Sequence, residues 1–194
     1  MQWSIANIFG NKSLGLGFCW NGKNDDESRH KAAERLAQHI FDTYDKSNKE
    51  PITLIGHSHG GNLAIEAANI LIEKHGVKAE QINIVAVNTP REHDFVLWHK
   101  DVNIFAINAF DDKVQWGGSD GSGFFKKSPR GDTFIGNTDK TIWYKDQYKS
   151  DKKLGIELNH GGIYSKNVKV WILNLKKAVD NNKAGGTKKM NSKN

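Results

Sequence analysis

Hydrophobic residues recur along the chain with helical spacing in three segments. Residues 25–44 carry apolar side chains on one face, and Arg29 is among the charged residues assigned to the opposite face. Residues 62–73 predict an alanine-rich helix that ends near Gly76, since glycine commonly follows the last turn of a helix. Val168 to Val179 predicts a final helix. The pattern therefore indicates a chain with at least three amphipathic or buried helices.

Short, nearly continuous apolar runs lie between these helices and predict buried strands. They are Leu14 to Trp20, Ile52 to Ile55, Ile82 to Val87 and Val102 to Phe110. Cys19, within the first run, is expected to be a small buried hydrophobic residue. The alternation of strands with helices predicts an α/β fold with a mainly parallel sheet, in which ligands bind beyond the carboxyl ends of the strands.

The second of these runs continues into Gly56-His57-Ser58-His59-Gly60, a G-x-S-x-G pattern between a predicted strand and a predicted helix. This context is typical of a nucleophile elbow, in which a sharp turn presents the serine hydroxyl to a substrate. Glycines on both sides of the serine are expected to allow the strand and the helix to approach closely. The backbone amide of His59 is then a candidate donor to an oxyanion.

The same residues admit two other interpretations. A tight turn that merely contains a serine would not need the strand before it and the helix after it. His57 and His59 form an H-x-H pair, as some metal sites do, but the chain continues with Gly60-Gly61-Asn62 and offers no further ligands. The sequence therefore predicts no metal site and requires no cofactor.

A serine nucleophile needs a base and an acid that orients the base. In folds with this elbow the chain order is serine, acid, histidine, and only His160 follows both other members. Asp111 and Asp112 follow the strand that ends at Phe110. Asp112 is preferred because the apolar Val114, two residues later, is expected to fold back onto the core and fix the carboxylate. Asp111 remains the alternative acid, with a turn-capping role if it is not used.

Composition narrows the class of protein. The 194 residues are 37% hydrophobic and carry a net charge of +6, much of it from lysines near the C-terminus. These features predict a single globular domain over residues 1–180 and a basic, disordered tail over 181–194. A single cysteine excludes an internal disulfide framework. Neither a signal peptide nor a transmembrane segment is recognised, so a cytoplasmic location is the default expectation.

The stretch from Gln115 to about Thr141 is rich in glycine. It lacks a lysine placed as a phosphate loop requires, so nucleotide binding is not predicted. The net positive charge of the chain does not by itself predict binding to nucleic acid. Residues 116–130 interleave aromatic and basic side chains. They predict either a lid that contacts a lipid surface or a loop whose aromatic side chains pack back on the sheet.

Taken together, these motifs resemble the α/β-hydrolase superfamily and, within it, bacterial lipase-like domains, some of which are toxin or secretion-effector modules. The resemblance covers residues 14–180. It is carried by residues 18–24, the segment from Arg29 to Leu36, the elbow residues 56–62, Asn88-Thr89-Pro90-Arg91, residues 112–114 and His160. It implies a three-layer sandwich around a mainly parallel sheet, a Ser58–His160–Asp112 triad, and export as an effector as an alternative to a cytoplasmic location.

The chain departs from that resemblance at its beginning. Such domains usually carry an upstream strand that ends in His-Gly and supplies a second oxyanion donor, and no His-Gly precedes Leu14. The sheet is therefore expected to be reduced at the N-terminus, with residues 1–13 left as a remnant of the following helix. A missing upstream segment, a partner chain or an irregular substitution by residues 1–9 could supply the strand.

The sequence thus predicts a carboxylic ester hydrolase of lipase or phospholipase type, acting on an ester or lipid substrate through an acyl-enzyme. The main alternative is a catalytically impaired hydrolase-fold module that binds lipid or a partner protein. A thioesterase or an acyltransferase is a further alternative, because acyl acceptors leave no short motif in a sequence.

Overall fold

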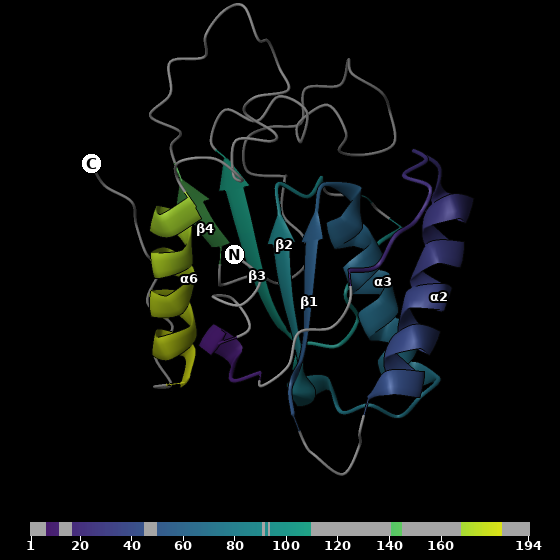
Figure 1. The fold of residues 1–194 in the computed structure, drawn as a ribbon, viewed down its shortest axis with the longest axis horizontal. Helices are drawn as coiled ribbons and strands as arrows, with labels where there is room; N and C mark the ends of the chain where they lie inside the picture. Colours follow the sequence, from purple (N-terminus) through teal and green to yellow (C-terminus); the bar gives the residue numbers. More distant parts are fainter. Residues whose placement is uncertain are drawn as a thin grey trace, which may run out of the picture.

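The structure is a computed structural model that describes residues 7–11, 17–44, 50–90, 92, 94–109, 141–144 and 168–183. Four parallel strands form one sheet in the order β1-β2-β3-β4, as Figure 1 shows. They are β1 (Ile52–His57), β2 (Ile82–Val87), β3 (Asn103–Ala109) and β4 (Thr141–Tyr144). The α/β class and the parallel sheet predicted from the sequence are confirmed.

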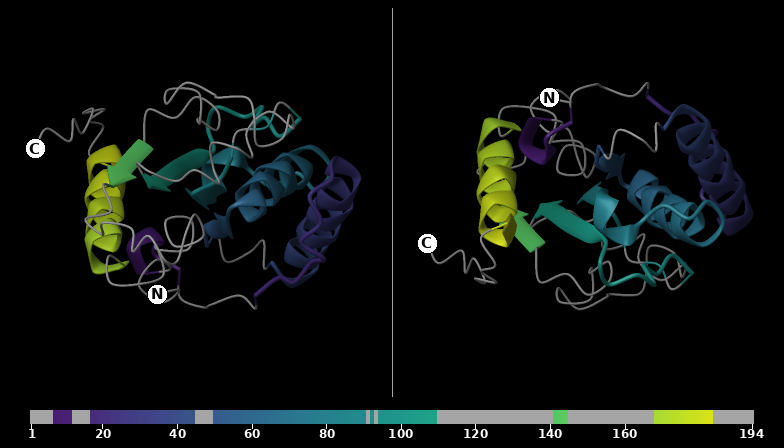
Figure 2. Two further views of the ribbon diagram at one scale, coloured as in Figure 1. Left: turned by 90° about the horizontal axis from the view of Figure 1, so that it is seen from above. Right: turned by 90° about the horizontal axis from the view of Figure 1, so that it is seen from below.

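Helices cover both faces of this sheet, which gives the predicted layered architecture (Figure 2). α3 (His59–Glu73) packs on one face and α2 (Asp26–Thr43) packs over α3. α6 (Val168–Lys183) and a helical turn at residues 7–9 lie on the other face. α6 extends four residues beyond the predicted end at Val179. A short 3₁₀ helix, η1 (Ala79–Gln81), leads into β2.

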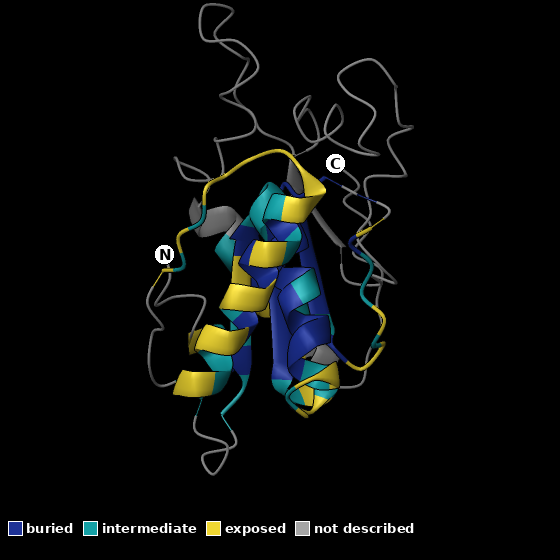
Figure 3. Ribbon diagram, turned by 90° about the vertical axis from the view of Figure 1, so that its right-hand side faces the viewer, coloured by how far each residue is buried: buried dark blue, intermediate teal, exposed yellow. Residues whose placement is uncertain are grey.

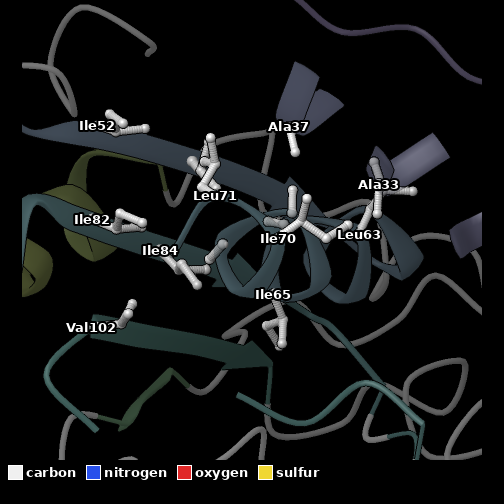
Figure 4. Close-up of a cluster of buried hydrophobic side chains, with 14 of the residues drawn as sticks. Ala33, Ala37, Ile52, Leu63, Ile65, Ile70, Leu71, Ile82, Ile84 and Val102 are labelled. Carbon is white, nitrogen blue, oxygen red and sulfur yellow. The ribbon is translucent and has the colours of Figure 1, made fainter. Parts of the chain in front are cut away.

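The larger core lies between α2, α3 and the sheet. Ala33 and Ala37 on α2 face a layer that includes Leu63 and Leu71 on α3 and Ile84 on β2 (Figure 4). Alanines on α2 let the two helices approach, and α3 is buried on most of its surface because it lies between α2 and the sheet. The outer face of α2 is exposed along its length, as the pattern in the sequence predicted (Figure 3).

The smaller core fills the opposite face. Phe9 meets Phe105 edge to face, with ring centroids 5.4 Å apart. Val87 on β2 joins them, and Leu175 and Val179 on α6 close the cluster. Among the described residues no such cluster includes β1, and Ile55 on this face is 43% exposed. The described helices of the second layer therefore cover β2 and β3 but not β1.

Two expectations about the N-terminal region are corrected. Residues 17–20 form no strand, and Cys19 is exposed rather than buried. Phe18 and Trp20 still pack against the larger core, so their hydrophobic character is explained by packing and not by strand pairing. The remaining part of the predicted strand, at 14–16, lies outside the described residues.

Among the described residues, β1 pairs with β2 alone and so lies at the edge of the described sheet. The reduction of the sheet expected at the N-terminus stays a prediction, because residues 1–6 and 12–16 lie outside the described residues. Residues 7–9 are helical and do not pair with β1. Asn11 instead contacts the beginning of β1 through its side chain, accepting from the Thr53 hydroxyl at 2.7 Å. No helix in the described part of the chain is long and apolar enough to span a membrane.

Candidate active site

Ser58 occupies the turn between β1 and α3, where the elbow was predicted. Its φ of 54° and ψ of −135° lie in a region that residues with a side chain rarely adopt. The turn is held by two backbone hydrogen bonds: the Ser58 amide donates to Val87 O, and the Gly61 amide donates to Ser58 O, both at 2.9 Å. The surrounding structure therefore imposes a strained backbone on this serine.

Ser58 is also the N-cap of α3, yet its side chain makes no capping hydrogen bond. Serine at this position ordinarily accepts a hydrogen bond from an amide of the first turn. Here Ser58 lacks the extended backbone conformation that an N-cap residue usually has, and no such hydrogen bond forms. The half-buried Ser58 hydroxyl is not committed to its own helix, as a nucleophile must not be.

Close packing at the elbow depends on Gly56 and Gly61. A Cβ on Gly56 would overlap the backbone of Gly60 and Gly61, which confirms the predicted close approach of strand and helix. A Cβ on Gly60 would meet nothing within 4 Å, so the expectation that Gly60 serves the same purpose is wrong. Gly61 has that role instead, because a Cβ there would overlap the side chain of Thr89.

The strand ends beside the elbow form one edge. In the register of the sheet His57 lies beside Val87, and Val87 lies beside Ile107. Asn88 follows β2 with a φ of 46°, and its amide donates to Ile107 O at 2.8 Å. Ser58 and Asn88 thus leave the sheet at the carboxyl ends of neighbouring strands, the edge where parallel sheets bind ligands.

His59, the first residue of α3, belongs to a charged cluster that the sequence did not predict. Its Nδ1 lies 3.0 Å from Oε1 of Glu92, and Oε2 of Glu92 accepts from Nη2 of Arg29 at 2.7 Å. Arg29 and Glu92 are only 3% and 6% exposed. Arg29 had been assigned to the polar face of its helix, which is wrong. Its spacing of four residues from the buried Ala33 was the signal for the inner face.

The remaining predicted site residues cannot be measured against Ser58. Asp111, Asp112 and His160 lie outside the described residues, as does the loop at 116–130. β3 ends at Ala109, so both aspartates follow it closely in sequence. Within the described ranges, no three histidine, cysteine or acidic side chains gather as metal ligands would. The triad, including Ser58 as its nucleophile, remains a prediction.

Comparison with known proteins gives one match. A family model described as "Thioesterase domain" matches residues 16–97, a segment that includes α2, the elbow and β2 but ends before either aspartate. No curated protein and no solved structure matches. Thioesterase domains belong to the α/β-hydrolase superfamily, so the match supports that superfamily. With the parallel sheet and the elbow, it gives a fold of α/β-hydrolase type and indicates a hydrolase of ester or thioester bonds.

Proposed function

We propose that this protein is a serine hydrolase of acyl esters, of lipase or phospholipase type, with Ser58 as its nucleophile. The observation that carries the proposal is the state of Ser58, which has a strained φ of 54° and a side chain that does not cap α3. Backbone strain at a single polar residue beyond a strand end is typical of functional sites.

The proposed reaction proceeds through an acyl-enzyme. Ser58 Oγ attacks the acyl carbon while its proton moves to His160, whose orientation is set by Asp112 or, alternatively, Asp111. The charge that develops on the acyl oxygen is stabilised by the His59 amide at the positive end of the α3 dipole. The bond to the leaving oxygen then breaks, and His160 returns the proton to that oxygen. Water then attacks the acyl carbon of the acyl-enzyme while its proton moves to His160. The bond to Ser58 Oγ breaks, the proton returns to Oγ, and the free acid is released.

A thioester substrate is the second candidate, and the family that matches residues 16–97 favours it. The same residues would act, but the leaving group would be a thiolate, with a pKa of about 8.5 for a simple thiol. Such a group leaves without the full proton transfer that an alkoxide needs. With an alcohol or thiol in place of water, the acyl-enzyme would instead make the protein an acyltransferase.

A module that binds lipid or a partner protein without catalysis is the third candidate. The position of β1 at the edge of the described sheet favours it, because the second oxyanion donor implied by the resemblance would come from a neighbouring strand. Loss of one such donor typically lowers kcat by about 10²–10³-fold.

Covalent labelling of the full chain by a fluorophosphonate tests whether Ser58 is a nucleophile. We expect time-dependent labelling of the wild type and none of the S58A variant. Labelling that is equal in both, or absent from both, would contradict catalysis by Ser58 and favour the binding module. The thermal midpoint of S58A provides the control for folding.

The choice between substrate classes needs turnover measurements on matched acyl chains. We expect fatty-acid release from phospholipid vesicles, anionic or neutral, to exceed hydrolysis of an acyl thioester of the same chain length, and both to be lost in S58A. Faster release of free thiol from the thioester would contradict the lipase assignment and support the thioesterase. Vesicle sedimentation with the inactive S58A protein tests lipid contact through residues 116–130 separately from turnover.

A further inference from the structure

The buried cluster of Arg29, Glu92 and His59 joins three segments that are distant in sequence: the first turn of α2, the first turn of α3 and the segment after β2. Glu92 bridges the other two residues, one carboxylate oxygen to each. Arg29 also donates to Oδ1 of Asn24 at 2.9 Å and pairs with Asp26. Its guanidinium lies 5.3 Å from the ring centroid of Phe95. The cluster therefore fixes its members from several sides.

Stability alone is a weak explanation for this arrangement. Removing two charges from water costs several kcal/mol per ion in typical proteins, and the attraction within the pair does little more than offset that cost. What a buried pair with several partners does provide is a fixed geometry, even though Nε of Arg29 has no hydrogen-bond partner among the described residues. The geometry fixed here is that of the residue that directly follows Ser58.

We propose that Glu92, held in place by Arg29, is a positioning residue that aims the His59 amide at the oxyanion. The proposal rests on the function proposed for Ser58. A carboxylate only accepts hydrogen bonds, so the 3.0 Å contact of Glu92 Oε1 with Nδ1 of His59 requires a proton on Nδ1. Nη1 of Arg29 lies farther from the same nitrogen, at 3.4 Å, so the shorter contact to Glu92 is the one that anchors the imidazole. Because the imidazole is attached to the first residue of α3, this contact limits rotation of the peptide that joins Ser58 to His59.

Thr89 supports the same turn from a second position. Its side chain packs against Gly61, where no Cβ could be accommodated. The segment that follows β2 therefore touches α3 at both His59 and Gly61, with Thr89 and Glu92 as its two contacts. Holding the first turn at two points fixes the direction of its free amides, which an oxyanion donor requires because misplacement by about 1 Å can cost about 10²-fold in rate.

The E92Q variant tests this role with little change in volume. The amide oxygen of glutamine would accept from Arg29, so its nitrogen would face Nδ1 of His59 as a donor. That contact can form only if His59 loses the Nδ1 proton and takes the other tautomer, so E92Q either breaks the contact to His59 or reverses the direction of its hydrogen bond. We expect kcat toward an ester substrate to fall by about 10- to 100-fold with KM nearly unchanged, less than the loss expected from complete removal of a donor. The wild-type thermal midpoint should be largely retained.

E66Q is the matched control. Glu66 lies on α3, the helix that begins at His59, and its Oε1 lies 3.2 Å from Nδ1 of His30. This pair is more exposed than the pair of Glu92 with His59, and neither member is next to Ser58 in sequence. We expect E66Q to leave kcat unchanged. Equal losses in E92Q and E66Q would overturn the proposal, because any glutamate–histidine contact on α3 would then have the same effect.

A spectroscopic readout separates this proposal from the proposed function. In ¹⁵N spectra of the full chain, the His59 amide resonance and the protonation of its Nδ1 should change in E92Q and remain unchanged in E66Q. If wild type shows no turnover that depends on Ser58, the proposed function fails while the spectra still decide the role of Glu92. An unchanged His59 amide resonance in E92Q, or an unchanged kcat of E92Q when the wild type is active, would overturn the role proposed for Glu92.

The E92D variant provides the same test if E92Q does not fold. The shorter side chain keeps the charge next to Arg29 and withdraws the carboxylate from His59. We expect it to show the same shift of the His59 amide and a loss of kcat in the same direction. A folded E92D with a wild-type His59 amide would count against the proposal as directly as E92Q.

Discussion

At the scale of single residues, Ser58 and its glycines illustrate how far a short motif can be trusted. The G-x-S-x-G spacing correctly located the turn, because a strand that runs directly into a helix leaves few backbone solutions. It did not indicate which glycine faces which neighbour. Gly61 faces Thr89, which lies 28 positions away and becomes a neighbour only when β1 and β2 pair.

The two glycines of the motif should respond oppositely to alanine. G56A places a Cβ against the backbone of Gly60, so the free energy of unfolding should fall by about 1–3 kcal/mol, as for other overpacked sites. G60A meets open space in the first turn of α3 and should be neutral or stabilising by up to about 1 kcal/mol. Urea denaturation of both variants measures the difference. A G56A protein as stable as G60A would contradict the packing described for the elbow.

Arg29 shows the corresponding limit for charged residues. The spacing of Arg29 from Ala33 places Arg29 on the inner face of α2. Its residue type argues the other way, because arginine is rarely buried without a partner. That partner, Glu92, is 63 positions away in the sequence. Burial of this side chain was therefore decided by a contact between distant segments.

At the scale of elements, α2 has a capping arrangement that could be anticipated from the sequence. Asp25 accepts a hydrogen bond from the Ser28 amide at 2.8 Å, the expected geometry of an N-cap. That hydrogen bond is the main reason that the pKa of Asp25 lies below its ordinary value of 3.8. The ionised carboxylate thus stabilises the start of α2.

The stability that Asp25 contributes should depend on pH with a definite sign. Because its pKa is lower in the folded state, the contribution is complete above the unfolded pKa and disappears as the pH falls through the folded pKa. D25A should lower the thermal midpoint by about 2–4 °C at pH 7, and the difference from wild type should shrink as the pH falls below the ordinary aspartate pKa of 3.8.

The matched control for D25A is D25N, which keeps an acceptor but does not titrate. Its difference from wild type should be small at neutral pH, since asparagine is as good an N-cap as aspartate. A deficit of D25A that stays constant from pH 7 to the acid range would refute the role of the ionised carboxylate.

Strands were predicted less reliably than helices, and the failures have one cause. β2 was predicted correctly because its six residues are all buried between two layers. Residues 17–20 are as apolar as a strand but form none, while β4, at the end of the glycine-rich stretch, was not predicted. A strand exists only when a neighbour supplies hydrogen bonds, and a local pattern contains no information about that neighbour.

At the scale of the whole molecule, the described sheet has one unpaired edge at β1. Ile55 is 43% exposed on a strand that pairs with β2 alone among the described residues. Exposed apolar residues on an edge strand favour pairing with another chain.

Self-association should therefore respond to charge at this strand. I55K should shift the protein toward the monomer in sedimentation velocity at high concentration, with little loss of stability because the lysine head group can reach water. L173K changes an equally apolar residue, 57% exposed on α6, and should leave self-association unchanged. If L173K were as effective as I55K, general surface hydrophobicity rather than the β1 edge would be responsible.

The sequence by itself determined α2, the strand and helix of the elbow, β2, β3 and the candidate nucleophile, because period, capping and turn chemistry are local properties of the chain. Only the tertiary structure decided that β1 lies at an edge of the described sheet, that Thr89 packs on Gly61, and that Glu92 joins Arg29 to His59. These features depend on strand pairing and charge pairing between segments far apart in sequence. At Ser58 both contributions meet: the motif places the serine, and the segment that follows β2 holds the turn that presents it.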